Sequence, residues 1–131
     1  DMVVRGICCL RAGVPDETDN IHIISIVGRY LEHSRIYILG RGERARYYIG
    51  SADWMTRSTL RRVEIAAPVT APALKARLQH IFNTMLADNS NARVQQPDGS
   101  YVRRMPGADA VDCQAQFYEE AYQANVHSDL K

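Results

Sequence analysis

The chain has 131 residues and a formal net charge of only +1, so its overall charge provides no electrostatic argument for a nucleic-acid partner. Its 46% hydrophobic and 24% charged residues are typical of a globular domain with a core, and no apolar run approaches the roughly 20 residues that span a membrane. Its three cysteines lack the spacing of a metal site and are typical of reduced cytoplasmic thiols.

The N-terminal quarter predicts a strand followed by a helix. Met2–Leu10 is rich in β-branched and apolar residues, with Arg5 as its single charge, and this pattern favours a strand. After a polar loop, Ser25 is placed to cap the N-terminus of a helix that runs to about Glu32. A histidine then follows at the junction between this helix and the next strand.

The next segment predicts a β-hairpin and a third strand. Arg35–Leu39 and Arg46–Ile49 are two apolar runs joined by the glycine-containing turn at Gly40–Glu43, which is typical of a hairpin. Met55–Leu60 is expected to be a loop or a short helix. Arg61–Val69 alternates between polar and apolar residues, so it predicts a strand with one polar face.

The last part of the chain predicts a helix, a small hairpin and a terminal helix. Pro72–Leu86 places apolar residues at helical spacing behind a proline suited to a helix start. Ala92–Gln95 and Tyr101–Arg104 flank a Pro-Asp-Gly-Ser turn, and Asp109–Val126 predicts the final helix. These elements indicate an α/β fold with a mixed β-sheet and packed helices, and the hairpins exclude a purely parallel, doubly wound sheet.

Two short motifs, His33–Arg35 (HSR) and Gly50–Asp53 (GSAD), concentrate the residue types that handle phosphoryl groups. An imidazole can act as a nucleophile or as an acid and base, and a guanidinium two residues later neutralises phosphate oxygens. The Gly-Ser turn adds hydroxyl and backbone N–H donors. The pattern is typical of a phosphoryl-transfer site, and a charged, solvated surface stays open as the alternative interpretation.

Other residues near these motifs have more than one interpretation. Ser51 and Asp53 either contact phosphate and position His33, or only stabilise their own turn. Trp54 is expected to pack under the Gly-Ser turn, with stacking on a nucleobase as the alternative. No cluster of carboxylates, histidines or cysteines has the spacing of metal ligands, so the sequence predicts no metal site of its own.

Several segments of the chain resemble one enzyme family, in order and over almost the whole length. They are RGICCL, SIVGRYLEHSRIYI, YIGSADWM, RRVEIAAPV and the stretch from Asn91 to Tyr101. They are similar to the C-terminal domain of polyphosphate kinase of the long-chain synthesising type. That family in turn resembles the phospholipase D superfamily, which is marked by H-x-K-x4-D and G-S-x-N.

This chain departs from the phospholipase D pattern at two positions. Arg35 stands in place of the lysine, keeping the charge and offering bidentate contact with phosphate. Gly40 stands in place of the aspartate, which removes a partner that the diesterases use. Both departures argue against ordinary hydrolysis of phosphodiesters.

The resemblance implies a single C-terminal phospholipase D-like half-domain, residues 1–131, of a larger polyphosphate kinase. The N-terminal, head and first catalytic domains of that enzyme lie outside this chain. The implied reaction is reversible transfer of the terminal phosphate of ATP to inorganic polyphosphate, through a phosphohistidine in the missing neighbouring domain. The 131-residue chain alone is therefore expected to be inactive.

The resemblance also implies roles for individual residues. His33 matches the family's supporting histidine, which binds nucleotide phosphate and assists transfer. Arg5 matches an arginine that binds ATP, and Arg62 matches one that contacts phosphates. Arg35 is expected to join them as a phosphate contact.

The implied partners are ATP or ADP, inorganic polyphosphate, the remaining domains of the same enzyme and further copies of the full-length chain, with no nucleic acid. Mg²⁺ would arrive with ATP, on ligands outside this chain, and the location would be cytoplasmic or peripheral on a membrane. Two other function classes stay open: a phospholipase D-like phosphodiesterase or nuclease that acts as a dimer, and a module that binds polyphosphate without catalysis.

Overall fold

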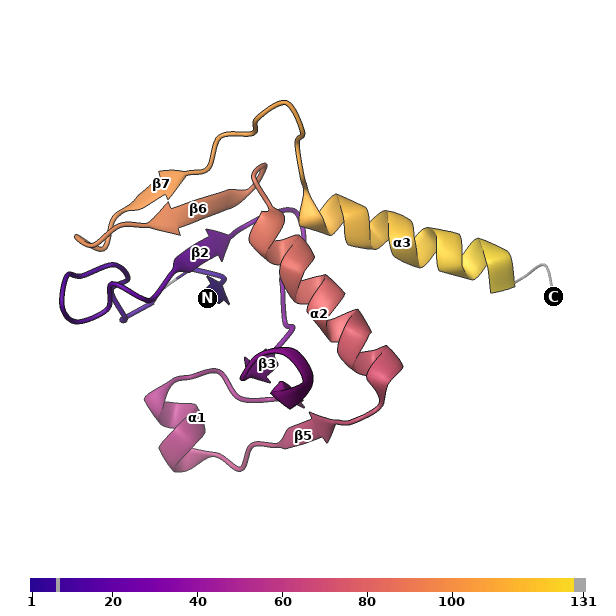
Figure 1. Cartoon of the computed structure of the whole chain (residues 1–131), viewed down its shortest axis with the longest axis horizontal. Helices are drawn as coiled ribbons and strands as arrows, with labels where there is room; N and C mark the ends of the chain where they lie inside the picture. Colours follow the sequence, from indigo (N-terminus) through magenta and orange to yellow (C-terminus); the bar gives the residue numbers. More distant parts are fainter. Residues whose placement is uncertain (7, 129–131) are drawn as a thin grey trace. The chain divides into compact units, whose positions relative to one another are not determined.

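The computed structural model describes residues 1–6 and 8–128, and Figure 1 shows the order of the elements along the chain. The chain divides into two compact units. The first comprises Asp1–Glu32 and the chain from Thr84 onward, and the second comprises His33–Asn83. No helix in the described residues is long and apolar enough to cross a membrane.

The first unit is built on a four-stranded mixed sheet in the order β1-β2-β6-β7. The strands are β1 (Met2–Val4), β2 (Ile23–Ile26), β6 (Ala92–Gln95) and β7 (Tyr101–Arg103). β1 runs parallel to β2, and the other neighbours are antiparallel. All four residues of β2 are buried, because this strand is paired on both sides, and it forms the centre of the core.

The helix expected from Ser25 to Glu32 is wrong. Ser25 and Ile26 belong to strand β2, and the residues from 27 to 35 form no regular helix or strand. The run of isoleucines pairs with β1 on one side and β6 on the other. Burial between these neighbours outweighs the weak local preference for a capped helix. His33 is therefore not at the end of a helix.

The strand expected over Met2–Leu10 is shorter than predicted, because β1 ends at Val4. Beyond it, side-chain bonds from Gln95 replace a backbone ladder. Gln95 Nε2 donates to the carbonyl of Leu10 at 3.0 Å, and the N–H of Ala12 donates to Gln95 Oε1 at 2.9 Å. A buried amide thus holds this loop against the sheet.

The second unit contains a three-stranded antiparallel sheet with the order β3-β4-β5. Its strands are β3 (Ile36–Leu39), β4 (Arg46–Gly50) and β5 (Ala66–Val69). The predicted hairpin is confirmed, with Ile36 opposite Ile49. The turn contains the short 3₁₀ helix η1 (Gly42–Arg44) and a glycine, Gly40, at φ +88°, a region that side chains disfavour.

Three α-helices complete the fold of the described residues. The segment expected to be a loop or a short helix is the short helix α1 (Thr56–Arg61), and α2 (Pro72–Ala87) confirms the predicted long helix. α3 (Cys113–Ser128) begins at Cys113, four residues after the predicted start at Asp109. The predicted strand from Arg61 to Val69 is paired only over β5. The mixed α/β fold class is confirmed, with the strands divided between two sheets.

Candidate functional site

His33 is exposed and lies in the irregular segment that precedes β3. Its backbone is held by Arg35, whose Nη1 donates to the His33 carbonyl at 3.0 Å. The strand pairing holds Arg35 in turn, since the Gly50 N–H donates to its carbonyl at 3.0 Å. The imidazole of His33 is therefore carried on a backbone that the hairpin fixes, with its ring open to solvent.

The structure brings the two sequence motifs together through Arg35 and Asp53. The Nε of Arg35 lies 3.0 Å from Oδ1 of Asp53, and the two side chains are 26% and 45% exposed. The hydrogen bond to Asp53 raises the pKa of Arg35 above its ordinary value, so the guanidinium stays charged. Two of the five N–H donors of an arginine are used here, and the others can still meet an anion.

Ser51 closes the turn against the segment that leads into β5. Its backbone N–H donates to the carbonyl of Ile65 at 3.0 Å, and its Oγ accepts the Ile65 N–H at 3.0 Å. The hydroxyl itself donates to Oε2 of Glu64. Ser51 thus stabilises the turn, and this is one of the two roles that the sequence left open.

Glu64 also reaches Arg62, with 3.9 Å between Glu64 Oε1 and Arg62 Nε. The Arg62 side chain is 61% exposed and the Glu64 side chain only 17%. This loose contact leaves the guanidinium of Arg62 accessible to a phosphate. Glu64 belongs to no motif in the sequence. It contacts Ser51 and Arg62 because residues 62–65 lie beside the Gly-Ser turn.

Trp54 does not pack under the Gly-Ser turn as expected, because its side chain is 84% exposed. The space beside the turn is occupied by Tyr37. A Cβ added to Gly50 would lie 2.8 Å from the Tyr37 ring, and the Tyr37 hydroxyl donates to the carbonyl of Ala52 at 2.7 Å. The rings of Trp54 and Tyr37 are in a T-shaped arrangement, with the centroids 5.9 Å apart and 69° between the ring planes.

In the first unit, two side chains hold the segment that ends at Glu32, the residue before His33. Arg5, which is exposed, donates from Nη1 to the Glu32 carbonyl at 3.1 Å. Gln114, in the first turn of α3, accepts the Tyr30 N–H at 2.9 Å and donates to the Tyr30 carbonyl at 2.9 Å. It also donates to Oε1 of Glu32 at 3.0 Å.

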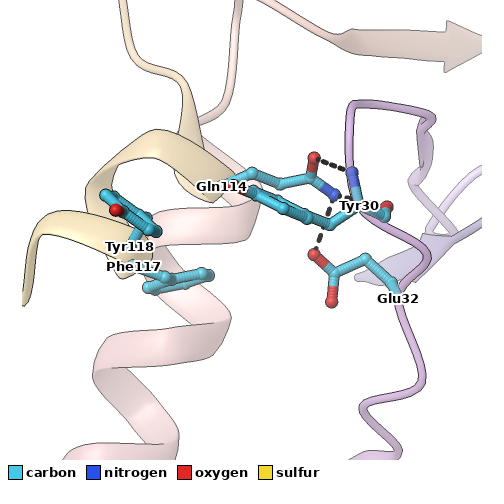
Figure 2. Close-up of a pocket in the computed structure, with 5 residues that line it drawn as sticks. All are labelled: Tyr30, Glu32, Gln114, Phe117 and Tyr118. Atoms are coloured by element: carbon cyan, nitrogen blue, oxygen red, sulfur yellow. Dashed lines mark hydrogen bonds between the residues drawn. The ribbon is translucent and has the colours of Figure 1, made fainter. Parts of the chain in front are cut away.

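Figure 2 shows Gln114 pointing from α3 toward Tyr30 and Glu32. These three residues, together with Phe117 and Tyr118 of α3, line a pocket in the first unit. Sequence reasoning missed Gln114, because its partners lie more than 80 residues away in the chain. No short motif in the sequence indicates this role, because the burial of Gln114 at the start of α3 is apparent only from the structure.

Gly28 packs directly against Gln114, and we predict that Gly28→Ala destabilises the protein by about 1–3 kcal/mol. The added Cβ would lie 2.4 Å from Gln114 Oε1. Urea unfolding measures the effect, with Gly107→Ala as the matched control because nothing lies within 4 Å of that Cβ. In a Gln114→Ala background most of the cost of Gly28→Ala should disappear, and an equal loss there would contradict the proposed clash.

Among the residues that the structure describes, no group of three or more His, Cys, Asp or Glu side chains could hold a metal ion. The candidate groups for contact with an anion are basic side chains. Those predicted from the sequence are His33, Arg35 and Arg62 in the second unit and Arg5 in the first unit. The chemistry available in this chain is therefore binding of phosphate oxygens, proton donation and stabilisation of negative charge.

Comparison with known families matches residues 1–116 to the family described as polyphosphate kinase C-terminal domain 2. Among curated proteins, the polyphosphate kinase of Synechocystis is 54% identical over 108 residues, which is 82% of this chain and 15% of that protein. The polyphosphate kinase of Bacillus anthracis is 45% identical over 124 residues, which is 94% of this chain and 18% of that protein.

The chain is also similar to a solved structure, the crystal structure of polyphosphate kinase from Porphyromonas gingivalis. The TM-score is 0.85 and the sequence identity 34%, over 93% of this chain and 19% of that one. The chain thus spans less than a fifth of the length of these relatives. The family match over residues 1–116 covers both sequence motifs, and the structural match supports the fold.

Proposed function

The chain belongs to the polyphosphate kinase C-terminal domain family, and on that premise we propose that it supplies the ATP- and phosphate-contacting part of a polyphosphate kinase. The reaction is the reversible transfer of the terminal phosphate of ATP to the end of an inorganic polyphosphate chain. The observation that carries the proposal is the exposed imidazole of His33 on a backbone fixed by Arg35, which is itself paired with Asp53.

The transfer proceeds in two steps. The terminal phosphoryl group of ATP passes to a histidine in another domain of the enzyme, with ADP as the leaving group. The phosphohistidine then gives the group to the terminal oxygen of polyphosphate. His33 donates a hydrogen bond or a proton to the leaving oxygen, because negative charge develops there as the bond to phosphorus breaks.

Arg5, Arg35 and Arg62 contribute positive charge to phosphate binding. In phosphoryl transfer, catalysis depends mainly on positioning and electrostatic stabilisation of the transferred group. The raised pKa of Arg35 supports a permanently charged contact at this place. Mg²⁺ would enter with ATP, held by ligands outside this chain. The full enzyme is proposed to be cytoplasmic or peripheral on a membrane and to form homo-oligomers.

The experiment that tests this function uses the full-length protein that contains this chain. Purified enzyme, ATP and Mg²⁺ should yield inorganic polyphosphate and ADP in proportion. A phosphodiester substrate such as bis(p-nitrophenyl) phosphate should not be cleaved, because Arg35 and Gly40 replace the residues of the diesterase pattern. Diester cleavage without polyphosphate synthesis would favour a hydrolase, and polyphosphate binding without either reaction would favour a binding module.

We predict that the 131-residue chain alone forms no detectable polyphosphate from ATP. The histidine that accepts the phosphate is proposed to lie in another domain, so the first step lacks its acceptor. Incubation with radiolabelled ATP and separation of long-chain product measures the outcome. The full-length protein is the positive control, and synthesis by the short chain at a comparable rate would overturn the prediction.

We also predict that Arg35→Lys lowers turnover of the full-length enzyme by about tenfold, although it keeps the charge. Lysine lacks the guanidinium geometry that contacts Asp53 and the His33 carbonyl together. Arg44→Lys, on the exposed η1, is the matched control. Steady-state synthesis from ATP measures the effect, and equal turnover of the Arg35→Lys and wild-type enzymes would show that this geometry is not required.

A further inference from the structure

Two arginines of the first unit, Arg93 and Arg103, lie directly opposite each other in the β6–β7 hairpin. Residues in register across antiparallel strands point to the same face of the sheet. Both side chains are exposed. Like charges in this arrangement repel each other, and an anion bound between the two guanidinium groups would reduce this repulsion.

Within the described part of the chain, neither arginine forms an ion pair with a carboxylate. Arg103 donates from Nη2 to the carbonyl of Ser90 at 3.1 Å, which orients its guanidinium without neutralising the charge. Arg104, the next residue, differs. It donates to the carbonyls of Leu86 and Asp88 and so completes the end of α2. Of these three arginines, Arg93 and Arg103 are therefore the pair that can meet an external anion.

The sheet register also places this pair at a defined end of the four-stranded sheet. Val4, Ser25, Arg93 and Arg103 form one row across the strands. Arg5 follows Val4 immediately, and β2 leads from the same end into the segment that Arg5 holds at Glu32. Arg5, Arg93 and Arg103 therefore share one end of the sheet, with neighbouring strands about 4.8 Å apart.

We propose that Arg93 and Arg103 form a subsite for inorganic polyphosphate, separate from the contacts of Arg5 with ATP. A linear polyanion suits this row, because successive phosphates can meet charges on successive strands, and guanidinium groups bind phosphate oxygens in bidentate fashion. The proposal rests on the proposed function, since it assigns part of the substrate of that reaction to named side chains.

The test uses the full-length enzyme in the reverse direction, in which ADP and polyphosphate of defined length yield ATP. Arg93→Gln and Arg103→Gln should each raise the KM for long-chain polyphosphate by about three- to tenfold, and the KM for ADP should stay the same. Arg44→Gln is the control, because this exposed arginine lies in the other unit. Very short polyphosphate should show a smaller effect, since it need not reach the pair.

Thermal unfolding provides the second readout. Without polyphosphate, the Arg93→Gln variant should unfold at the wild-type temperature or above it, because a like-charge repulsion is removed. In the Arg103→Gln variant, loss of the hydrogen bond to the Ser90 carbonyl offsets this gain. The stabilisation produced by added polyphosphate should be reduced in the double variant. An unchanged polyphosphate KM in a double variant with normal turnover would overturn the subsite alone. A wild-type enzyme that forms no polyphosphate would instead contradict the proposed function.

Discussion

Replacing His33 by alanine in the full-length enzyme is expected to lower polyphosphate synthesis from ATP by roughly 10²- to 10³-fold, by analogy with the removal of one oxyanion donor. The exposed imidazole is proposed to donate to the leaving oxygen as the phosphoryl group departs. Its loss removes a contact that strengthens in the transition state. Turnover should therefore fall more than the affinity for ATP, a difference that steady-state kinetics over a range of ATP concentrations measures.

His22→Gln is the matched control, because His22 is also exposed and its side chain lies against Asp1, with 3.3 Å between His22 Nδ1 and Asp1 Oδ1. It should retain near wild-type turnover. His33→Gln adds a second comparison, since glutamine keeps an N–H donor but cannot transfer a proton. Recovery of activity with glutamine would assign a hydrogen-bonding role, and near-normal turnover with alanine would remove His33 from the mechanism.

Replacing Asp88 by alanine is expected to cost about 3–5 kcal/mol of stability, the largest structural effect we predict in this chain. Asp88 is fully buried at the end of α2. Its Oδ1 accepts the N–H groups of Ser90, Asn91 and Ala92 at 2.8–3.1 Å, and Oδ2 accepts that of Cys113 at 2.9 Å. Alanine would leave all four donors without this partner, and urea unfolding at neutral pH measures the loss.

The same carboxylate should contribute to acid sensitivity. Burial acts to raise the pKa of Asp88, but the N–H donors of Cys113, Asn91 and Ala92 outweigh it and the pKa is lowered. A lowered folded-state pKa stabilises the protein above the unfolded value of about 3.9, and this contribution is lost as pH falls through the folded pKa. The free energy of unfolding of the Asp88→Asn protein should therefore decrease less as the pH falls.

Asp109→Asn is the control for both measurements, because Asp109 is exposed and its side chain should affect stability by no more than about 0.5 kcal/mol. If Asp88→Ala unfolds at the same urea concentration as this control, the carboxylate is not the anchor of the turn. If the Asp88→Asn protein keeps the full acid-side loss, another carboxylate is responsible for it.

Local patterns predicted the elements whose signals lie within a few residues. The hairpin of β3 and β4 follows from two apolar runs around a glycine turn, and α2 follows from helical spacing behind Pro72. Local patterns gave a wrong helix at Ser25, because β2 is a strand through its pairing with β1 and β6. Residues 92–95 lie far away in sequence, so no local signal could show that pairing.

The candidate site was likewise predictable only where its residues belong to short motifs. The motifs placed His33, Arg35 and Asp53 together, and the structure joins the last two at 3.0 Å. The supporting groups could not be found in this way. Gln114 and Gln95 anchor loops more than 80 residues away, and Glu64 contacts Ser51 across the turn. These are amides and carboxylates whose roles depend on tertiary contact, and they belong to no short motif.

In the proposed mechanism, this chain supplies a supporting histidine and another domain carries the phosphate. The most direct test is to label the full-length enzyme briefly with ATP bearing a radioactive terminal phosphate and to map the phosphohistidine by peptide sequencing. We predict label on a histidine outside residues 1–131 and none on His33. Label on His33 would contradict this mechanism, because His33 would then be the carrier of the phosphoryl group.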